Sequence, residues 1–487
     1  MQSAWMPIWN WVMAVSRARL LLIAILWSWA AATAAQTALP DELQAAWRAT
    51  GLPQSALSLA VQEADGKALF SLNDSQPRNP ASVMKIVTTW AGLHTLGPEY
   101  RWRTAFLAEG GGRTDAQGTL SGPLYVKAGG DPLLTVADLW NMLRELRMRG
   151  VKNLTSVVVD RSVFGSVSID PAAFDASGDR PYNASPDAMM VGLGAFRVFV
   201  YPDPANKVWV PVVDPSVPGV RVSGRPQWRD GTCQGSPGGV GVNVQQQENG
   251  VVINVSGEAT GSCGAFSVWR LALSQPEYFS AVFRMLWREL GGTLARNIAE
   301  GAVPATATEL VWHQSDSLAN IIRRINKLSN NVMARHLLLG IAAKTHGPRA
   351  TPEAGARAIL GLLGQNGIDT SGWSIENGSG LSRTSRLTAR GLAGMLAHAW
   401  RSPIMPEFMS SMAISGVDGT VRRRLRNGSA HGRAHLKTGT LRDARALAGY
   451  VQGESGKRYI LVSMVNHDNA VAARPFEDAL VQWLSTR

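Results

Sequence analysis

The stretch of sequence that decides the fold of this chain is Asn79-Pro80-Ala81-Ser82-Val83-Met84-Lys85-Ile86-Val87-Thr88-Thr89. The apolar run after Pro80 predicts a helix that begins at a turn, which places Ser82 and Lys85 one turn apart on the same face. Ser82 is the only serine in the chain with a lysine three positions later. A serine hydroxyl becomes a useful nucleophile when a base lies within hydrogen-bond reach, and a partly desolvated lysine can be that base. The pair therefore indicates a catalytic serine, with an ordinary helix N-terminus as the alternative.

Two further motifs supply groups that such a serine would need. Ser329-Asn330-Asn331 and Lys437-Thr438-Gly439 follow it in that order. A serine acyl-transfer site requires a proton route to the leaving group, an oxyanion hole and a substrate anchor. Ser329 can relay a proton, the Asn331 amide can hold the substrate and orient the lysine base, and the charge of Lys437 can steer a carboxylate. Taken separately, the two motifs could be a helix–helix turn and a strand end.

The strand expected to carry Lys437 also offers main-chain groups. Gly439 has no side chain, so a substrate backbone can lie against the strand, and we expect Thr438, Gly439 and Thr440 to contact the substrate. The backbone N–H groups of Ser82 and Thr440 are the natural oxyanion donors, and loss of one such donor typically slows a reaction by about 10²–10³.

The three motifs in this order resemble the signature of penicillin-binding proteins and class A β-lactamases. The chain resembles in particular the penicillin-binding D-alanyl-D-alanine carboxypeptidase/endopeptidase family of low molecular mass, class C. This family inserts two domains between the first two motifs, and here Ser82 and Ser329 lie 247 positions apart. The resemblance also rests on Gly129-Gly130-Asp131-Pro132, Val158-Val159-Asp160, Tyr182-Asn183-Ala184-Ser185-Pro186, Gly378-Ser379-Gly380-Leu381-Ser382-Arg383 and Gly416-Val417-Asp418-Gly419-Thr420.

The resemblance implies an α/β (α+β) penicillin-binding/β-lactamase-like transpeptidase domain that is discontinuous and carries two inserted β-rich domains. The residue patterns along the chain agree with this fold. Helical and hairpin patterns at both ends flank a region that is rich in short β-like runs, Gly and Pro. We expect the catalytic domain at 36–100 and 305–487, a first inserted domain at 101–126 and 201–304, and a second inserted domain at 127–200.

The resemblance also implies an activity. A member of this family removes the terminal D-alanine from peptidoglycan stem peptides and cuts D-alanyl-diaminopimelate cross-bridges through an acyl-enzyme on Ser82, without a cofactor. Penicillin and other β-lactams, which mimic the terminal D-Ala-D-Ala, would acylate the same serine and leave slowly. The expected catalytic set is Ser82, Lys85, Ser329, Asn331 and Lys437.

Two more residues are assigned by resemblance to the substrate pocket. Asp160, at the end of the predicted strand Val157-Val158-Val159, would bind the free amine of diaminopimelate, and Arg383 would pair with the carboxylate of that residue. The alternative is that Asp160 caps a turn and Arg383 forms a surface ion pair. Asn377 stands where the family usually has Asp, which alters a loop contact and leaves the catalytic set complete.

Two other functions remain open. A β-lactamase would need a dedicated deacylating base, and no Glu-x-x-x-Asn loop of the class A type is evident between Ser82 and Ser329. A non-catalytic penicillin-binding or wall-binding protein could keep the fold, although the complete set of motif residues argues against this. Turnover of penicillin and formation of a covalent penicillin adduct distinguish these alternatives.

The N-terminus reads as a cleaved secretory signal over residues 1–35. Arg17 and Arg19 precede the apolar run from Leu20 to Trp29, and small residues up to Ala35 offer cleavage sites. This run of ten residues, nine of them apolar, is shorter than the roughly 20 residues that span a bilayer. The alternative is an uncleaved anchor extended by the apolar residues from Trp5 to Val15. With cleavage, the protein is expected to be periplasmic.

The charge and composition of the chain indicate which kinds of partner it can bind. The chain of 487 residues has a formal net charge of +12, which removal of the two signal arginines would lower to +10. Such a charge permits loose association with anionic lipid surfaces or an acidic wall polymer. No nucleic-acid-binding module is recognisable, and the densest basic group, Arg422-Arg423-Arg424 with Arg426, reads as a solvated helix face.

The cysteines and histidines indicate a disulfide and no metal. Cys233 and Cys263 are the only two cysteines, and an exported chain permits them to form one disulfide. Neither a Cys/His cluster nor a His-Glu-x-x-His motif with metal-ligand spacing is present, and His431 and His435 lie on a predicted strand approach where their spacing does not converge.

Overall fold

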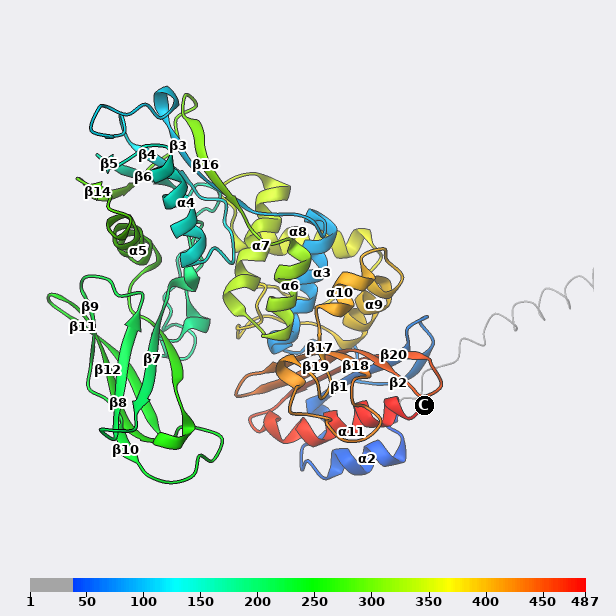
Figure 1. Ribbon diagram of the computed structural model, residues 1–487. Coiled ribbons are helices and arrows are strands. Elements are labelled where there is room, and N and C mark those ends of the chain that lie inside the picture. Colours follow the sequence, from blue (N-terminus) through cyan, green and yellow to red (C-terminus); the bar gives the residue numbers. More distant parts are fainter. Residues whose placement is uncertain (1–37) are drawn as a thin grey trace, which may run out of the picture.

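The computed structural model describes residues 38–487, so the predicted export signal lies outside the described residues. The described part forms a helix-rich lobe and an inserted region that stands beside it (Figure 1). The chain leaves the first lobe between α3 (Met84–Leu96) and β3 (Arg103–Ala108) and returns between β16 (Thr308–Gln314) and α6 (Leu318–Lys327). Within residues 38–487, no helix combines the length and the apolar character needed to cross a membrane.

The helix-rich lobe is built on one antiparallel six-stranded sheet in the order β17-β18-β19-β20-β1-β2. Both ends of the chain meet in it, because β1 pairs with β20 from Leu57 opposite Val465 to Glu63 opposite Tyr459. This closure makes the lobe a single domain that the insertion interrupts, which confirms the predicted discontinuous α/β fold. The strands are β1 (Leu57–Glu63), β2 (Ala68–Leu72), β17 (Ala413–Ile414), β18 (Ala434–Thr440), β19 (Ala444–Gln452) and β20 (Arg458–Asn466).

Helices cover both faces of this sheet (Figure 1). In β19, Ala446, Ala448 and Tyr450 belong to the core beneath α3, whereas Leu447 and Val451 belong to the core shared with α2 and α11. A strand buried on both faces is apolar along its whole length rather than alternating. The remaining helices of the lobe are α2 (Asp41–Arg48), α7 (Asn331–His346), α8 (Pro352–Gln365), α9 (Ala389–Trp400), α10 (Met405–Ser410) and α11 (Arg474–Ser485).

Two local breaks in helical structure position the motif residues. Ser82 lies in a short 3-10 turn (Ala81–Val83) that leads directly into α3, and Ala81 has a φ of 44°. The helical pattern around Ser329 is not one helix but two, because Ser329 has a φ of 57° and the Asn330 side chain caps α7 by accepting from Met333 N at 3.0 Å. Both breaks place a motif serine where the chain turns.

The first part of the insertion is a five-stranded sheet in the order β15-β6-β4-β3-β16, packed against two helices. Strands β4 and β6 are parallel, and the helix α4 connects them. The elements, apart from β3 and β16, are β4 (Leu124–Lys127), α4 (Val136–Met148), β6 (Val157–Asp160), α5 (Gln275–Glu289), β15 (Ile298–Glu300) and a small parallel pair, β5 (Asn153–Leu154) with β14 (Thr293–Leu294).

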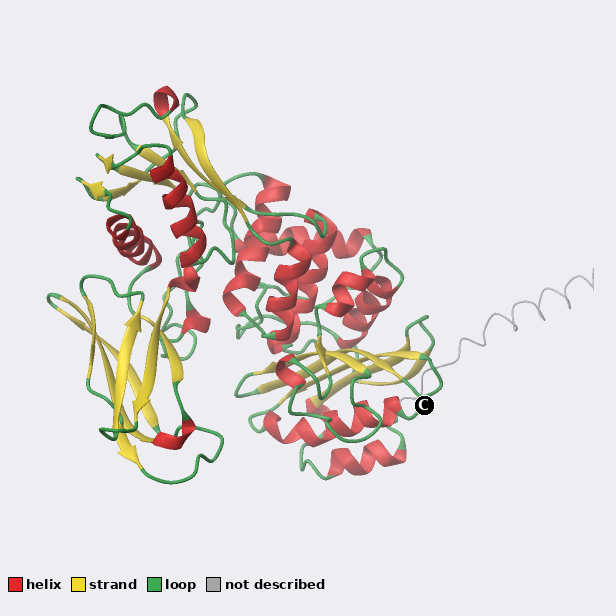
Figure 2. Cartoon of the chain, viewed as in Figure 1, coloured by secondary structure: helices red, strands yellow, loops and turns green. Residues whose placement is uncertain are grey.

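The second part is made of strands alone apart from short turns (Figure 2). A three-stranded sheet, β13-β7-β8, packs against a four-stranded one in which β12 pairs with β9, β10 and β11. The strands are β7 (Ala195–Asp203), β8 (Val208–Asp214), β9 (Val220–Ser223), β10 (Gln227–Arg229), β11 (Val240–Gln247), β12 (Gly250–Thr260) and β13 (Phe266–Leu271).

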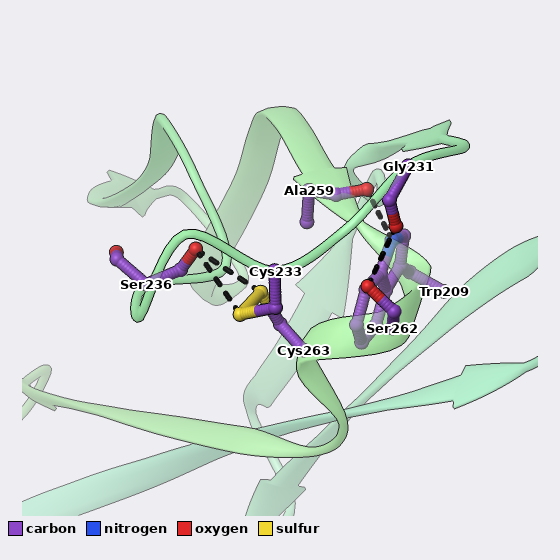
Figure 3. The surroundings of a disulfide bond; sticks show 7 residues. All are labelled: Trp209, Gly231, Cys233, Ser236, Ala259, Ser262 and Cys263. Carbon is purple, nitrogen blue, oxygen red and sulfur yellow. Dashed lines mark hydrogen bonds between the residues drawn. A yellow bond between two sulfur atoms is a disulfide. The ribbon is translucent and has the colours of Figure 1, made fainter.

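A disulfide joins Cys233 and Cys263 at the edge of this second part (Figure 3). The same two segments are also held together by Ser262 Oγ, which donates to Gly231 O at 2.7 Å. Closing a loop of 30 residues stabilises a fold by roughly 3–4 kcal/mol in the chain-entropy estimate.

The domain boundaries expected near 127 and 201 remain predictions, and the sheets group the strands of the insertion in two sets. Residue Lys127 ends β4 inside the first sheet, and β6 of the same sheet lies beyond it, whereas the second group of strands runs from Ala195 to Leu271. The first inserted part also contains α4 and α5, whose apolar faces pack on its sheet. Sequence texture locates strands, but pairing between distant strands decides which sheet they join.

The basic cluster near residue 424 is not simply a solvated face. Arg424 is buried and pairs with Glu477 and Asp478, and Arg445 binds the same oxygen of Glu477, Oε2. Arg422, Arg423 and Arg426 remain exposed or partly exposed.

Candidate active site

Ser82 and Lys85 lie within hydrogen-bond distance, as their spacing predicts. Lys85 Nζ is 2.9 Å from Ser82 Oγ, 2.6 Å from Asn331 Oδ1 and 2.5 Å from Ser379 O. A neutral lysine has two N–H donors and one lone pair. The two carbonyl-type oxygens can take both donors, which leaves the lone pair for the hydroxyl proton of Ser82.

The surroundings of Lys85 favour its neutral form. The side chain is fully buried. Burial lowers the pKa of Lys85 well below its ordinary value, and the positive charges of Lys437 and Arg335 lower it further. A lysine in this environment releases its proton far more readily than one in water, which is the property a general base needs.

Asn331 and Ser329 join this pair from the start of α7 and the turn before it. The Asn331 side chain donates from Nδ2 to the Tyr182 carbonyl at 3.4 Å, so one end of the amide faces Lys85 and the other faces the insertion. Ser329 Oγ accepts from Lys437 Nζ at 3.0 Å. The structure therefore forms two contact groups, Ser82 with Lys85 and Asn331, and Ser329 with Lys437. The charge of Lys437 acts on Lys85 across the two groups.

Lys437 is more deeply buried than a simple surface anchor. It is fully buried, donates to Thr438 O at 2.7 Å, and its burial lowers its pKa to about 7. The charge of Lys437 therefore depends on pH near neutrality. A carboxylate placed beside it would favour the charged form.

The strand β18 presents an open edge beside these groups. Its neighbour β17 pairs only with His435 and Leu436, so the segment from Lys437 to Thr440 is paired on one side alone, with β19. A peptide can add to such an edge by main-chain hydrogen bonds. Thr438 Oγ1 donates to Thr420 Oγ1 at 2.9 Å.

Gly439 allows β18 to approach the nucleophile turn. A Cβ atom at this position would lie 2.7 Å from Pro80 O and 3.0 Å from Ser82 N. The backbone of β18 thus runs against the Ser82 N–H, as an oxyanion hole shared by the N–H groups of Ser82 and Thr440 would require.

Asp160 lies apart from these contacts. It ends β6, is largely buried, and accepts hydrogen bonds from Ser162 N at 2.9 Å and Val303 N at 3.2 Å. Burial alone would raise the pKa of Asp160, but these hydrogen bonds and the charge of Lys127 outweigh it and hold the pKa below its ordinary value. Asp160 also lines a cavity of about 1110 Å³ in the insertion that none of the five motif residues lines.

Arg383 lies at the surface of the helix-rich lobe. It forms an ion pair with Asp443 at 2.9 Å, and its guanidinium carbon lies 4.4 Å from the centre of the Phe174 ring in the insertion. In the described structure, neither Arg383 nor Asp160 contacts a motif residue.

Three contacts of the site were not foreseen: those of the Ser379 carbonyl, the Tyr182 carbonyl and Arg335. Ser379 and Tyr182 belong to segments on which the family resemblance rests. The sequence therefore marked these segments, but it did not indicate that their carbonyl groups contact Lys85 and Asn331. Asn377, which departs from the family pattern, accepts from Ser379 N and Ser379 Oγ at 3.0 and 2.8 Å. An asparagine therefore still holds the loop that presents the Ser379 carbonyl to Lys85.

Metal ligands do not gather in the described part of the chain. No group of three or more His, Cys, Asp or Glu side chains in residues 38–487 is arranged to hold a metal ion.

Solved structures place this fold among the penicillin-binding proteins. The structure is similar to that of penicillin binding protein 4 (dacB) from Haemophilus influenzae, with a TM-score of 0.75 and 21% identity over 92% of this chain and 100% of that one. A complex of that protein with a β-lactam gives a TM-score of 0.72 and 22% identity, again over 92% of this chain and 100% of that one. At such identities the likeness establishes the fold.

The family follows from the sequence comparison. Residues 39–487 match the D-Ala-D-Ala carboxypeptidase 3 (S13) family, and the chain belongs to it, which confirms the resemblance seen in the motifs. The chain is 28% identical over 443 residues to a D-alanyl-D-alanine carboxypeptidase of Actinomadura sp. (strain R39), covering 85% of this chain and 77% of the relative. It is 25% identical over 396 residues to D-alanyl-D-alanine carboxypeptidase DacB of Haemophilus influenzae, covering 79% of this chain and 80% of the relative.

Proposed function

We propose that this protein is a serine-type D-alanyl-D-alanine carboxypeptidase that acts on peptidoglycan stem peptides through an acyl-enzyme on Ser82. The observation that carries this proposal is the arrangement around Lys85. Its Nζ lies 2.9 Å from Ser82 Oγ, while Asn331 and Ser379 provide acceptors for its N–H groups. A buried base in contact with a hydroxyl is the arrangement that activates a serine nucleophile.

The reaction follows from these contacts. Ser82 Oγ attacks the carbonyl carbon of the penultimate D-alanine while its proton passes to Lys85, and the N–H groups of Ser82 and Thr440 stabilise the oxyanion. The C–N bond then breaks, and the departing amine of D-alanine receives a proton through Ser329. Water attacks the Ser82 ester and releases the shortened peptide. Lys437 and the open edge from Thr438 to Thr440 hold the substrate carboxylate and backbone.

The same chemistry extends to two other substrates. In a cross-bridge, the leaving amine belongs to diaminopimelate, so cleavage there is a DD-endopeptidase reaction. In penicillin, the broken amide is part of a ring, so the leaving group stays attached and hinders water. The protein is then both an endopeptidase and a target of covalent inhibition by β-lactams.

Asp160 and Arg383 are proposed to bind the amine and the carboxylate of diaminopimelate. Their present contacts with backbone N–H groups and with Asp443 also fit the alternative of a turn cap and a surface ion pair. Asp160→Ala should weaken cleavage of diaminopimelate peptides by about 1–3 kcal/mol, because a charged hydrogen bond is lost. The rate of penicillin acylation is the control and should change little. A parallel fall in both rates would make Asp160 structural.

The proposed location is the periplasm, after cleavage of the signal at residues 1–35. A net charge of about +10 would hold the protein loosely at an anionic membrane surface or wall polymer. Binding to anionic vesicles that weakens as salt is added would support this association.

The test of the function is the product spectrum of the purified protein on D-Ala-D-Ala peptides and cross-linked muropeptides. We expect free D-alanine and, from the dimers, separated monomers. Rapid turnover of penicillin without peptide cleavage would identify a β-lactamase instead. Absence of both peptide cleavage and a penicillin adduct would identify a non-catalytic wall-binding protein.

A further inference from the structure

Arg335 carries a buried charge next to the catalytic groups. It lies four residues after Asn331 on α7, so both side chains project from the same helix face. Its side chain is buried, its Nε has no hydrogen-bond partner, and among residues 38–487 it forms no ion pair. Burial lowers the pKa of Arg335 only to about 10, so it stays charged at neutral pH. A buried cation without a carboxylate partner is costly, which makes a function for it worth seeking.

The one hydrogen bond of this guanidinium goes to the insertion. Arg335 Nη1 donates to Ala184 O at 3.0 Å. Two residues earlier, the Tyr182 carbonyl accepts from Asn331 Nδ2. Two side chains of α7 thus bind two carbonyls of the same inserted segment, those of Tyr182 and Ala184. Through Asn331, that segment is connected to Lys85.

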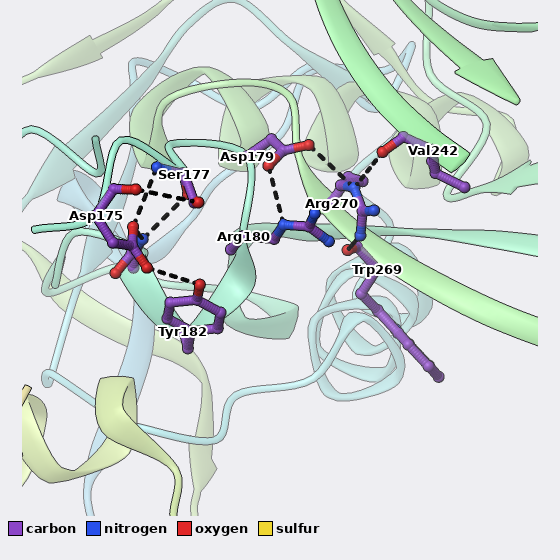
Figure 4. A network of polar contacts seen from close by, with 9 residues as sticks. Asp175, Ser177, Asp179, Arg180, Tyr182, Val242, Trp269 and Arg270 are labelled. Atoms are coloured by element: carbon purple, nitrogen blue, oxygen red, sulfur yellow. Dashed lines mark hydrogen bonds and ion pairs between the residues drawn. The ribbon is translucent and has the colours of Figure 1, made fainter. Parts of the chain in front are cut away.

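The segment they hold, residues 175–184, is itself braced within the insertion, and we call it the bridging segment (Figure 4). Asp175 accepts from Tyr182 Oη and from Asn183 Nδ2, both at 2.8 Å. Asp179 pairs with Arg270 of β13 at 3.0 Å, and its carbonyl accepts from Leu271 N at 2.8 Å. The bridging segment therefore transmits the position of the second inserted sheet to Asn331.

We propose that Arg335 is a positioning residue of the acyl-transfer reaction, which acts on Lys85 through its buried charge and on Asn331 through the Ala184 carbonyl. This inference rests on the proposed function. It concerns a residue outside the three motifs, and it separates two effects, a charge effect and a hydrogen-bond effect, that different substitutions can remove.

The charges that face Lys85 and Arg335 fix the direction of the charge effect. Lys85 faces the cations Lys437 from β18 and Arg335 from α7. Arg335 feels the carboxylate of Glu376, which is exposed and engaged by Ser382 and Thr384. The neighbouring His336 has a pKa lowered to about 4 by burial, so it stays neutral near neutral pH. Removal of the Arg335 charge should therefore let Lys85 keep its proton to higher pH.

The experiment is the pH dependence of the acylation rate with a fluorescent penicillin, for the full chain and three variants. Arg335→Met removes charge and donor, Arg335→Gln removes the charge and keeps a donor, and Arg335→Lys keeps the charge. Lys344→Met, an exposed position on the same helix, is the matched control. Thermal unfolding of each variant checks that it is folded. If Arg335→Met does not fold, Arg335→Gln is the variant that tests the loss of charge.

We expect the acid limb of the profile to move to higher pH in Arg335→Met and Arg335→Gln, so that the acylation rate measured on the acid side falls relative to the wild type. Arg335→Lys and Lys344→Met should keep the wild-type limb. Arg335→Gln should have the higher plateau of the two neutral variants, because it can still donate to Ala184 O. We assign the alkaline limb to loss of the positive charge on Lys437. This limb should not move in the Arg335 variants, because burial and not the charge of Arg335 lowers the pKa of Lys437.

An unmoved acid limb in both neutral variants would overturn the inference and reduce Arg335 to a structural residue, even if their rates or stabilities fell. That result is distinct from failure of the proposed function, which would show as a wild-type protein that forms no penicillin adduct. In that case this inference would fall as well.

Discussion

Lys85 and Lys437 are both fully buried, but their partners differ in kind. Lys85 faces the Ser82 hydroxyl and two carbonyl-type acceptors, whereas Lys437 faces the Ser329 hydroxyl and its neighbour's carbonyl at the open strand edge. The contacts of Lys85 suit a general base. The contacts of Lys437 suit a group that binds an anion when it is protonated. The two lysines should therefore be separable by substrate and by pH.

Lys437→Ala should reduce kcat/KM for a peptide that ends in a free carboxylate much more than for the corresponding amide. Lys85→Ala should slow both to a similar extent, because it removes the base.

The free-enzyme pKa of Lys437 is about 7, so its charge is lost as pH rises through that value. In the wild type, kcat/KM for the carboxylate peptide should then fall on the alkaline side while the amide is less affected. Equal losses for both substrates in Lys437→Ala would exclude the anchor role.

At the scale of secondary-structure elements, the site depends on the contact between β18 and the turn that carries Ser82. Gly439 of β18 lies against Pro80 O and Ser82 N, and a Cβ at Gly380 would lie 1.8 Å from Ala81 O on the other side of the same turn. Glycines on both sides let backbone segments close on the nucleophile.

Gly439→Ala should lower the penicillin acylation rate by about 10²–10³, the usual effect of losing an oxyanion donor, because the new methyl group would push β18 away from Ser82 N. Stopped-flow or gel-based acylation measures this. Gly361→Ala in α8 is the control, since a Cβ there meets open space. An acylation rate in Gly439→Ala equal to that of the control would show that β18 does not need this close approach.

The limits of sequence reasoning are visible at this scale. The offset between Ser82 and Lys85 is local, so helix periodicity predicts their contact. The break at Ser329 was expected only as one alternative, because a positive φ at a serine has no strong sequence signal. The Ser379 carbonyl and the Arg335 charge could not be predicted, since they reach Lys85 through tertiary packing. The family resemblance predicted which motif residues form the site. The other contacts of the site depend on tertiary packing and are seen only in the structure.

In the molecule as a whole, the insertion has its own covalent link, the disulfide between Cys233 and Cys263. Most of its buried apolar residues form one cluster that includes both inserted sheets and continues into the helix-rich lobe through Leu339 and Ala342 of α7 and Ala354 of α8. Sequence texture predicted an interrupted α/β domain correctly. It could not predict the pairing within the first inserted sheet, because its strands β3, β4, β6, β15 and β16 come from distant parts of the chain.

Removal of the disulfide should therefore act on stability and not on chemistry. Replacing Cys233 and Cys263 with serine should destabilise the second inserted part by about 3–4 kcal/mol, because the 30-residue loop is no longer closed in the unfolded state. Thermal unfolding and the acylation rate, measured on the same samples, check both halves of this statement. A large fall in the acylation rate of the still-folded variant would mean that the disulfide supports the active site directly.

The measurement that tests the account most directly is the mass-spectrometric mapping of the penicillin adduct on the purified protein. We predict a single covalent adduct on the peptide that contains Ser82, no adduct in Ser82→Ala, and greatly slowed formation of the adduct in Lys85→Ala. An adduct on another residue, or labelling that persists in folded Ser82→Ala, would contradict the assignment of Ser82 as the nucleophile and with it the proposed acyl-enzyme.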